Sequence, residues 1–166
     1  MRAKLMGLFL LGLVRLLTGS QARWHGCPPK AEQRIYFANH QSHADLVMIW
    51  AALPEELRSI TRPIAARDYW TKTPFKQWIT TAVFNAVYVE RERKEGVDPL
   101  APLIEALESG DSIIIFPEGT RGFGEEPQPF KSGLYSLAQK FPHVVLVPAW
   151  IDNIQRVMPK GEVVPV

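Results

Sequence analysis

A short polar segment at residues 39 to 45, Asn-His-Gln-Ser-His-Ala-Asp, interrupts a chain that otherwise alternates apolar runs with brief links. Inside a buried strand each of these polar side chains would need a partner or would destabilise the fold, so we expect the segment at the edge of a sheet. The spacing of His40 and Asp45 brings an imidazole in a turn close to a carboxylate in the following helical turn. A carboxylate that accepts a hydrogen bond from one ring nitrogen fixes the tautomer and leaves the other nitrogen free to take a proton. The pair therefore predicts a general base.

Two simpler interpretations of the same segment stay open. Ser42 and Asp45 stand three residues apart before an apolar run, which is a capping-box pattern with aspartate in place of glutamate. His40, His43 and Asp45 could instead bind a metal ion, as in a metal-dependent phosphoesterase, although the two remaining histidines show no ligand spacing. The chain has no Gly-x-Ser-x-Gly elbow, no P-loop and no Gly-x-Gly-x-x-Gly, the usual signatures of acyl-enzyme hydrolysis and nucleotide binding. We therefore expect a base that works without a protein nucleophile and without a metal.

A second polar insertion, Phe-Pro-Glu-Gly-Thr-Arg-Gly at residues 116 to 122, follows the most apolar run of the chain. Glu118, Thr120 and Arg121 are therefore expected at the carboxyl end of a strand. Gly119 beside them permits an unusual backbone conformation. A loop of this kind can hold an anion, although it could also be a surface turn with a glutamate–arginine pair.

The elements that must position these two segments are strands and helices in alternation. Apolar runs predict strands at residues 34–38, 62–66, 86–91, 112–116 and 143–151. Helical signals fall at residues 43–53, 74–84, 98–110 and 132–141. Near-continuous apolar strands separated by helices predict an α/β domain with a mostly parallel or mixed central sheet and helices on both faces. Sheets of this type build their sites at strand-to-helix turns, where both polar segments fall.

Residues 1 to 22 are predicted to be a membrane-interface helix that precedes one domain at residues 23 to 166. The apolar run is broken at Arg15, so it falls short of the about 20 residues that a membrane span needs. On a helix, Lys4 and Arg15 lie about 20° apart, which gives a thin polar stripe on an apolar rod. The apolar face that would enter the interface comprises Leu5, Leu8, Phe9, Leu13 and Leu16. A signal peptide, and an amphipathic helix packed on the domain, are the alternatives.

Composition limits the class of partner. With 166 residues, 46% of them hydrophobic and 22% charged, the chain can bury one sizeable core. Residues 58 to 94 hold eight basic and three acidic residues, a bias that suits an anionic ligand or a lipid headgroup but also a solvated basic face. No nucleic-acid partner is expected, because no nucleic-acid-binding motif accompanies the charge. Cys27 is the only cysteine, so no disulfide forms within the chain.

Together the two segments resemble the glycerolipid acyltransferase family, most closely the 1-acylglycerol-3-phosphate acyltransferases, over about residues 32 to 153. The family's first block, Asn-His-x-Ser-x-x-Asp, is matched in full by Asn39, His40, Ser42 and Asp45. Its third block, Phe-Pro-Glu-Gly-Thr-Arg-Ser, is matched from Phe116 to Arg121, with Gly122 in place of the serine. A Val-Pro dipeptide on a strand, the fourth block, is present as Val147-Pro148.

The second block, Gly-x-x-Phe-Ile-Asp-Arg, is matched loosely: Arg91 is kept, while Asn85, Tyr88 and Glu90 replace the glycine, phenylalanine and aspartate. The resemblance implies that His40 removes the proton of an acceptor hydroxyl as it attacks an acyl thioester, with Asp45 orienting and stabilising His40. It further implies acceptor and phosphate contacts from Arg67, Arg91, Glu118, Gly119, Thr120 and Arg121.

The resemblance also implies the substrates and the setting. The acceptor would be 1-acylglycerol-3-phosphate, and the thioester co-substrate would be acyl-CoA or acyl carrier protein, with no cofactor. The protein would lie on the cytoplasmic face of a phospholipid membrane as a peripheral or monotopic enzyme. The alternatives are an acyltransferase for another lysolipid or an amino-acid lipid, and a peripheral lipid-binding protein with a dead site. Because the chain ends without a closing helix, we expect the domain to be either incomplete at its C-terminus or unusually compact.

Overall fold

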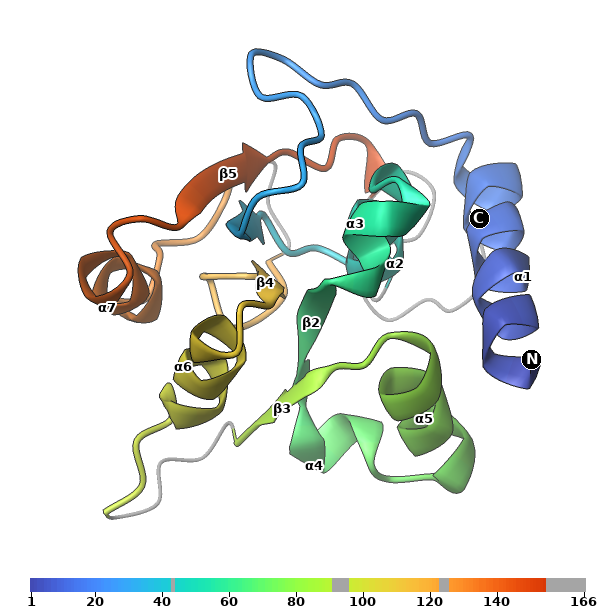
Figure 1. The fold of residues 1–166 in the computed structure, drawn as a ribbon. Helices are drawn as coiled ribbons and strands as arrows, with labels where there is room; N and C mark the ends of the chain where they lie inside the picture. Colours follow the sequence, from blue (N-terminus) through green and yellow to red (C-terminus); the bar gives the residue numbers. More distant parts are fainter. Residues whose placement is uncertain (43, 91–95, 123–125, 155–166) are drawn as a thin grey trace.

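Five parallel strands form the centre of the molecule. The computed structural model describes residues 1–42, 44–90, 96–122 and 126–154. The strands are β1 (Arg34–Ala38), β2 (Thr61–Ala66), β3 (Val87–Val89), β4 (Ser112–Ile115) and β5 (Val145–Ala149). They pair in the order β3-β2-β4-β1-β5, and every pairing is parallel (Figure 1). The predicted fold class and all five predicted strands are thereby confirmed.

The register of the sheet brings the ends of β1 and β4 together. Phe37, the next-to-last residue of β1, pairs with Ile115, the last residue of β4. On its other side Phe37 pairs with Pro148 of β5. Because parallel strands point the same way, the residues that follow β1 and β4 leave the sheet at the same edge. The two polar segments of the sequence are therefore neighbours in space.

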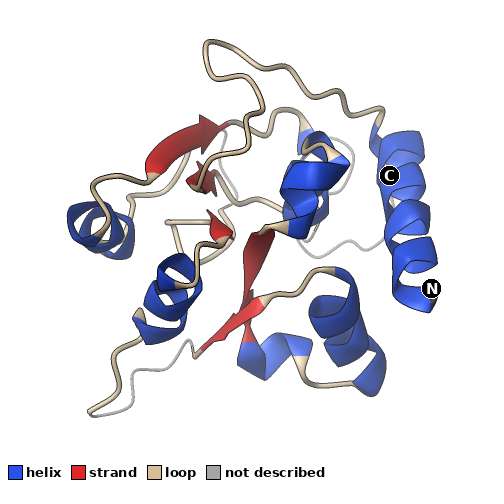
Figure 2. Ribbon diagram, in the orientation of Figure 1, coloured by secondary structure: helices blue, strands red, loops and turns tan. Residues whose placement is uncertain are grey.

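Helices cover both faces of the sheet (Figure 2). The helices are α1 (Arg2–Thr18), α2 (Asp45–Ala52), α3 (Glu55–Ser59), α4 (Arg67–Trp70), α5 (Pro74–Trp78), α6 (Ala101–Glu108) and α7 (Gly133–Lys140), with a π-helical turn, η1 (Ile79–Val83). One core cluster joins α1 and α2 to the face of β1 that carries Tyr36. The other joins α6 and α7 to the face that carries Ile35, in agreement with the side-chain alternation of a strand.

Two short helices depart from the sequence-based expectation. Neither α3 nor α4 exceeds five residues, so neither is long enough to show a 3.6-residue hydrophobic repeat. The helix expected at residues 74 to 84 begins at Pro74, where Thr73 caps it by accepting a hydrogen bond from the Lys76 amide at 3.3 Å. It then widens into η1. The strand expected at residues 86 to 91 is shorter, and residue 91 lies outside the described part of the chain.

The N-terminal helix α1 docks onto the domain by one side, through buried apolar residues and the two basic residues of its polar stripe. Gly7, with Leu11 and Val14, is buried against α2 and η1. Lys4 forms an ion pair of 2.9 Å with Glu55, and this hydrogen bond lowers the pKa of the Glu55 carboxyl. The guanidinium of Arg15 caps α2 by donating to the carbonyl oxygen of its residue 51 at 3.0 Å. The packed-helix alternative therefore holds for one face of α1.

The wide apolar face of α1 points away from the domain. Leu5, Leu8, Phe9 and Leu16 are between 53% and 81% exposed. α1 therefore buries Leu11 and Val14 on its docked side and leaves these four large apolar side chains in contact with solvent, whereas an ordinary surface helix has polar residues on its outward face. Within residues 1–42, 44–90, 96–122 and 126–154, no helix is long and apolar enough to cross a membrane.

Replacing Gly7 with leucine should lower the free energy of unfolding. A β-carbon at position 7 would already lie 3.2 Å from Trp50 Cη2 and 3.5 Å from Val83 Cγ1, and overpacking of this kind typically costs about 1–3 kcal/mol. Gly12→Leu is the matched control, because a β-carbon at position 12 has nothing within 4 Å and the change also removes a helical glycine. Urea unfolding should give a lower midpoint for G7L and an unchanged or higher one for G12L. Equal midpoints would contradict the docking.

Candidate active site

The neighbouring strands β1 and β5 are joined just beyond their ends by the side chain of Asn39. Its Nδ2 donates to the carbonyl oxygen of Ile151 at 2.9 Å, and its Oδ1 accepts from the amide of the same residue at 2.8 Å. Asn39 is 3% exposed. The residue that follows, His40, therefore starts from a fixed backbone position at the edge of the sheet.

The predicted pair of His40 and Asp45 is present. His40 Nδ1 lies 2.9 Å from Asp45 Oδ2, and the same oxygen accepts from the backbone amides of Gln41 at 2.6 Å and Ser42 at 2.8 Å. Since a carboxylate can only accept, Nδ1 carries a proton, and in the neutral ring Nε2 therefore has the lone pair. Asp45 is fully buried, whereas the His40 side chain is 23% exposed. The ring also stacks on Phe116, with centroids 4.3 Å apart.

The capping interpretation of this segment holds only in part, because α2 begins at Asp45 after Ala44, which makes no side-chain cap. The Asp45 carboxylate reaches back to the amide of Ser42, three residues earlier, as in a capping box. Ser42 Oγ in turn accepts from the amide of Ala44 at 3.3 Å. One carboxylate oxygen therefore both holds the turn that precedes α2 and orients the histidine ring. His43, which the metal interpretation needs, lies outside the described residues. Among the residues that the structure does describe, no three His, Cys, Asp or Glu side chains gather as a metal site.

Glu118 connects the loop after β4 to the loop after β1. Its Oε1 accepts from the amide of His40 at 2.8 Å, and its Oε2 accepts from the amide of Gln128 at 3.0 Å. The amide of Gly122 donates to the carbonyl oxygen of His40 at 2.8 Å, so the His40 backbone is held on both sides by one loop. Glu118 is 3% exposed. Its geometry favours a role in positioning His40 over direct contact with a ligand.

The other predicted binding residues fall into two groups. Gly119, Thr120 and Arg121 follow Glu118 directly, and Gly119 adopts a left-handed backbone with φ of +70°, which favours glycine. Thr120 is exposed and Arg121 is partly buried. These three residues adjoin His40, because their loop holds its backbone at both ends.

Arg67 begins α4 after β2, and β4 lies between β2 and β1, so its strand is two spacings of about 4.8 Å from the strand of His40. Its Nε pairs with Glu90 at 3.0 Å, and its guanidinium lies 5.1 Å from the ring centre of Tyr88. Together with Arg62 it lines a polar groove of about 300 Å³ beside β3 and α6. Arg91 lies outside the described residues.

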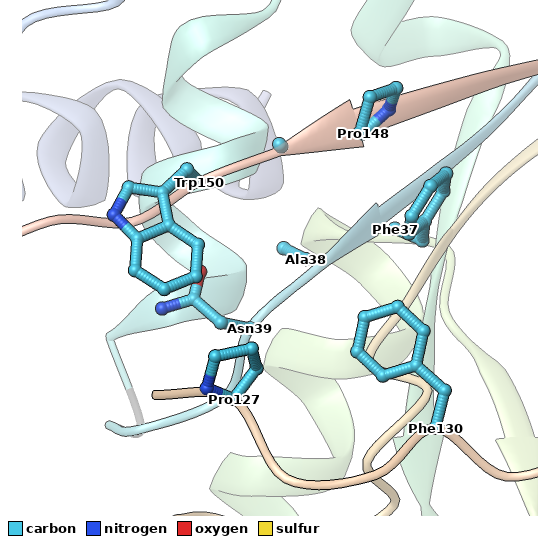
Figure 3. A pocket seen from close by; sticks show the side chains of 8 residues that line it. Phe37, Ala38, Asn39, Pro127, Phe130, Pro148 and Trp150 are labelled. Carbon is cyan, nitrogen blue, oxygen red and sulfur yellow. The ribbon is translucent and has the colours of Figure 1, made fainter. Parts of the chain in front are cut away.

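An apolar groove of about 300 Å³ opens at the same edge of the sheet. Figure 3 shows Phe37 and Phe130 on one side of it and Trp150 on the other, with Asn39 between them. Phe37 and Phe130 meet edge to face, with ring centroids 6.2 Å apart. Phe37 lies on the opposite face of β1 from Tyr36, whose face carries α2 and Asp45, so this groove and the His40 ring lie on different sides of the strand end.

Comparison with known proteins agrees with the resemblance read from the sequence. Residues 24–152 match the model of the family described as Acyltransferase. The 1-acyl-sn-glycerol-3-phosphate acyltransferase of Helicobacter pylori is 33% identical over 110 residues, which cover 65% of this chain and 44% of that protein. The human 1-acyl-sn-glycerol-3-phosphate acyltransferase alpha is 28% identical over 158 residues, or 92% of this chain and 52% of that protein.

A solved structure is also similar over most of the chain. The crystal structure of the 1-acyl-sn-glycerophosphate (LPA) acyltransferase PlsC from Thermotoga maritima matches with a TM-score of 0.73 and 28% identity. The match covers 96% of this chain and 61% of that one. The chain spans about half the length of the curated relatives it matches.

Replacing Glu118 with glutamine should destabilise the protein by about 1–3 kcal/mol, because one of the two backbone amides would then face an amide NH₂ instead of an acceptor oxygen. Glu126→Gln is the matched control, since Glu126 lies on the same connection and is exposed. Chemical unfolding gives the free energy of each variant. A Glu118→Gln protein as stable as Glu126→Gln would show that the Glu118 carboxylate does not hold these loops together.

Proposed function

Because the chain belongs to the acyltransferase family, we propose that it moves an acyl group from a thioester to the free hydroxyl of 1-acylglycerol-3-phosphate. The observation that carries this proposal is the contact of 2.9 Å between His40 Nδ1 and the buried Asp45 carboxylate. It leaves Nε2 as an acceptor on a partly exposed ring at the edge of the sheet. The similar proteins of Helicobacter pylori and humans, both 1-acyl-sn-glycerol-3-phosphate acyltransferases, support the choice of acceptor.

The proposed reaction needs one base and no covalent enzyme intermediate. His40 Nε2 takes the proton of the acceptor hydroxyl while the hydroxyl oxygen attacks the thioester carbonyl carbon. The tetrahedral intermediate then collapses to the ester and expels the thiolate. The imidazolium gives its proton to the thiolate, which leaves as a thiol. Asp45 stabilises the imidazolium during this exchange, because its carboxylate already accepts from Nδ1.

The acceptor's phosphate is assigned to the loop after β4. Arg121 would make a charge-assisted contact, and Gly119 and Thr120 would add backbone and hydroxyl donors. Arg91 keeps its proposed role on the resemblance alone. Arg67 follows β2, two strand spacings from the strand of His40, whereas Arg121 lies on the loop that holds the His40 backbone, so Arg121 is the nearer partner. No resident metal or cofactor enters this scheme, and the donor is either acyl-CoA or acyl carrier protein.

Association with the cytoplasmic face of a membrane is proposed from the outward face of α1. Leu5, Leu8, Phe9 and Leu16 are large, apolar and exposed, and they lie on one side of a helix that is docked to the domain by its other side. Their insertion into the headgroup boundary would remove this surface from water without unfolding anything. The lipid acceptor and the lipid product partition into the same layer.

Substituting His40 with alanine should reduce acyl transfer by about 10²-fold or more, since general-base assistance is typically worth 10²–10⁴. Transfer of a radiolabelled acyl group to 1-acylglycerol-3-phosphate and, in parallel, to 1-acylglycerol measures both rate and acceptor choice. His143→Ala is the control, because His143 is exposed and follows α7, away from the loops that hold His40. Full activity of a folded His40→Ala protein would refute the mechanism. Equal rates of the wild type on both acceptors would instead indicate a different lysolipid.

Replacing Leu8 and Phe9 together with glutamine should release the protein from phospholipid vesicles. Burying one such side chain is worth about 1.5–3 kcal/mol, so the double change should weaken partitioning at least tenfold. Val97→Gln serves as the control, because Val97 is 56% exposed but lies in the connection before α6. Co-sedimentation with anionic vesicles is the measurement. Unchanged sedimentation of the double variant would place the membrane contact elsewhere on the molecule.

A further inference from the structure

A segment downstream of the loop after β4 folds back onto it. The amide of Lys131 donates to the carbonyl oxygen of Pro117 at 2.9 Å. Three residues earlier, the amide of Gln128 donates to Glu118 Oε2 at 3.0 Å. The backbone of residues 128 to 131 is therefore held against the loop at two points, and the side chain of Lys131 starts from a fixed position beside it.

The side chain of Lys131 runs across Gly119. A β-carbon at position 119 would lie 2.6 Å from Lys131 Nζ, 2.8 Å from Cε and 3.0 Å from Cδ. Real β-carbons do not approach other atoms so closely, so the ammonium occupies room that only a glycine leaves open. The residue has positive φ as well, so an alanine there would be strained and would also displace the ammonium.

The ammonium of Lys131 has no counter-charge among the described residues. The ion pairs of the described residues involve other cations, for example Lys4 with Glu55 and Arg67 with Glu90. Glu118, the acidic residue next to Gly119, accepts one backbone amide on each of its oxygens. Lys131 is exposed, so an anion from solution can reach it.

This charge lies on the loop that holds the proposed base. Glu118 and Gly122, on either side of Gly119, hydrogen-bond to the amide and the carbonyl oxygen of His40, each at 2.8 Å. A group bound over Gly119 is therefore held by the same loop that positions the imidazole. A lysine suits a phosphate here, because it supplies a compact charge with three donors and requires no planar fit.

On this basis we propose that Lys131 binds a phosphate monoester over Gly119, on the same loop as Arg121. The inference deepens the proposed function, since it assigns a further residue to substrate binding in the acyl transfer. Neither polar segment of the sequence contains Lys131. The phosphate has two sources in the reaction, the acceptor 1-acylglycerol-3-phosphate and the nucleotide part of acyl-CoA.

The test measures kcat/KM for the wild type, Lys131→Ala and Lys131→Met, which removes the charge but keeps a long side chain over Gly119. Lys140→Ala is the matched control, because Lys140 is also exposed and ends the following helix, α7. Each variant is assayed with 1-acylglycerol-3-phosphate and with 1-acylglycerol as acceptor. The donor is either acyl-CoA or an acyl-pantetheine thioester, which carries no phosphate. Thermal unfolding checks that each variant is folded.

Loss of the charge-assisted contact should lower kcat/KM by about tenfold or more wherever the bound phosphate is present. A loss seen only with the phosphorylated acceptor assigns the site to the acceptor, and one seen only with acyl-CoA assigns it to the donor. Lys131→Arg should retain part of the activity in either case. Equal losses with every substrate pair, or no loss, would overturn the inference. A wild type that acylates neither acceptor would refute the proposed function itself, which is a separate result.

Discussion

The candidate site depends on one buried carboxylate, that of Glu118, which joins two loops 78 residues apart in the chain. A parallel sheet brings the ends of β1 and β4 to the same edge, but strand pairing alone leaves the loops beyond them unconstrained. Glu118 removes that freedom because a buried charge must keep its hydrogen bonds, and both of its partners are backbone amides. The position of His40 relative to the loop after β4 follows from this constraint.

Asp45 constrains His40 in a similar way, from the other side of the residue. It too is buried, and it too binds backbone amides, those of Gln41 and Ser42. The two carboxylates have separate tasks, since Glu118 fixes the backbone of the histidine and Asp45 fixes its ring. Both negative charges are buried, whereas Thr120 and the cationic side chain of Lys131 are exposed. The histidine is thus held by anions from within the protein, and the ammonium of Lys131 faces solvent.

The sheet and the His40–Asp45 pair could be predicted because their signals are local: apolar runs for the strands, and a five-residue spacing for the pair. The role of Glu118 could not be predicted, because its partners are backbone amides 78 and 10 residues away. Nearly every residue has a backbone amide, so the sequence does not indicate which one a side chain will bind. The polar stripe of α1 was predicted, but its docking partner Trp50 is a distant residue. The short helices α3 and α4 are set by their neighbours and lack a periodic pattern of their own.

The side chain of Asn39 reproduces the hydrogen bonds of a peptide group. Its amide gives one donor and one acceptor to Ile151, as a neighbouring strand residue would, so it adds a rung between β1 and β5 that contains no backbone of its own. An aspartate has almost the same shape but no donor, and its second oxygen would face the Ile151 carbonyl oxygen. Hydrolysis of this one amide, the deamidation that ages many proteins, would therefore turn an attraction between the two strands into a repulsion, one residue before the histidine.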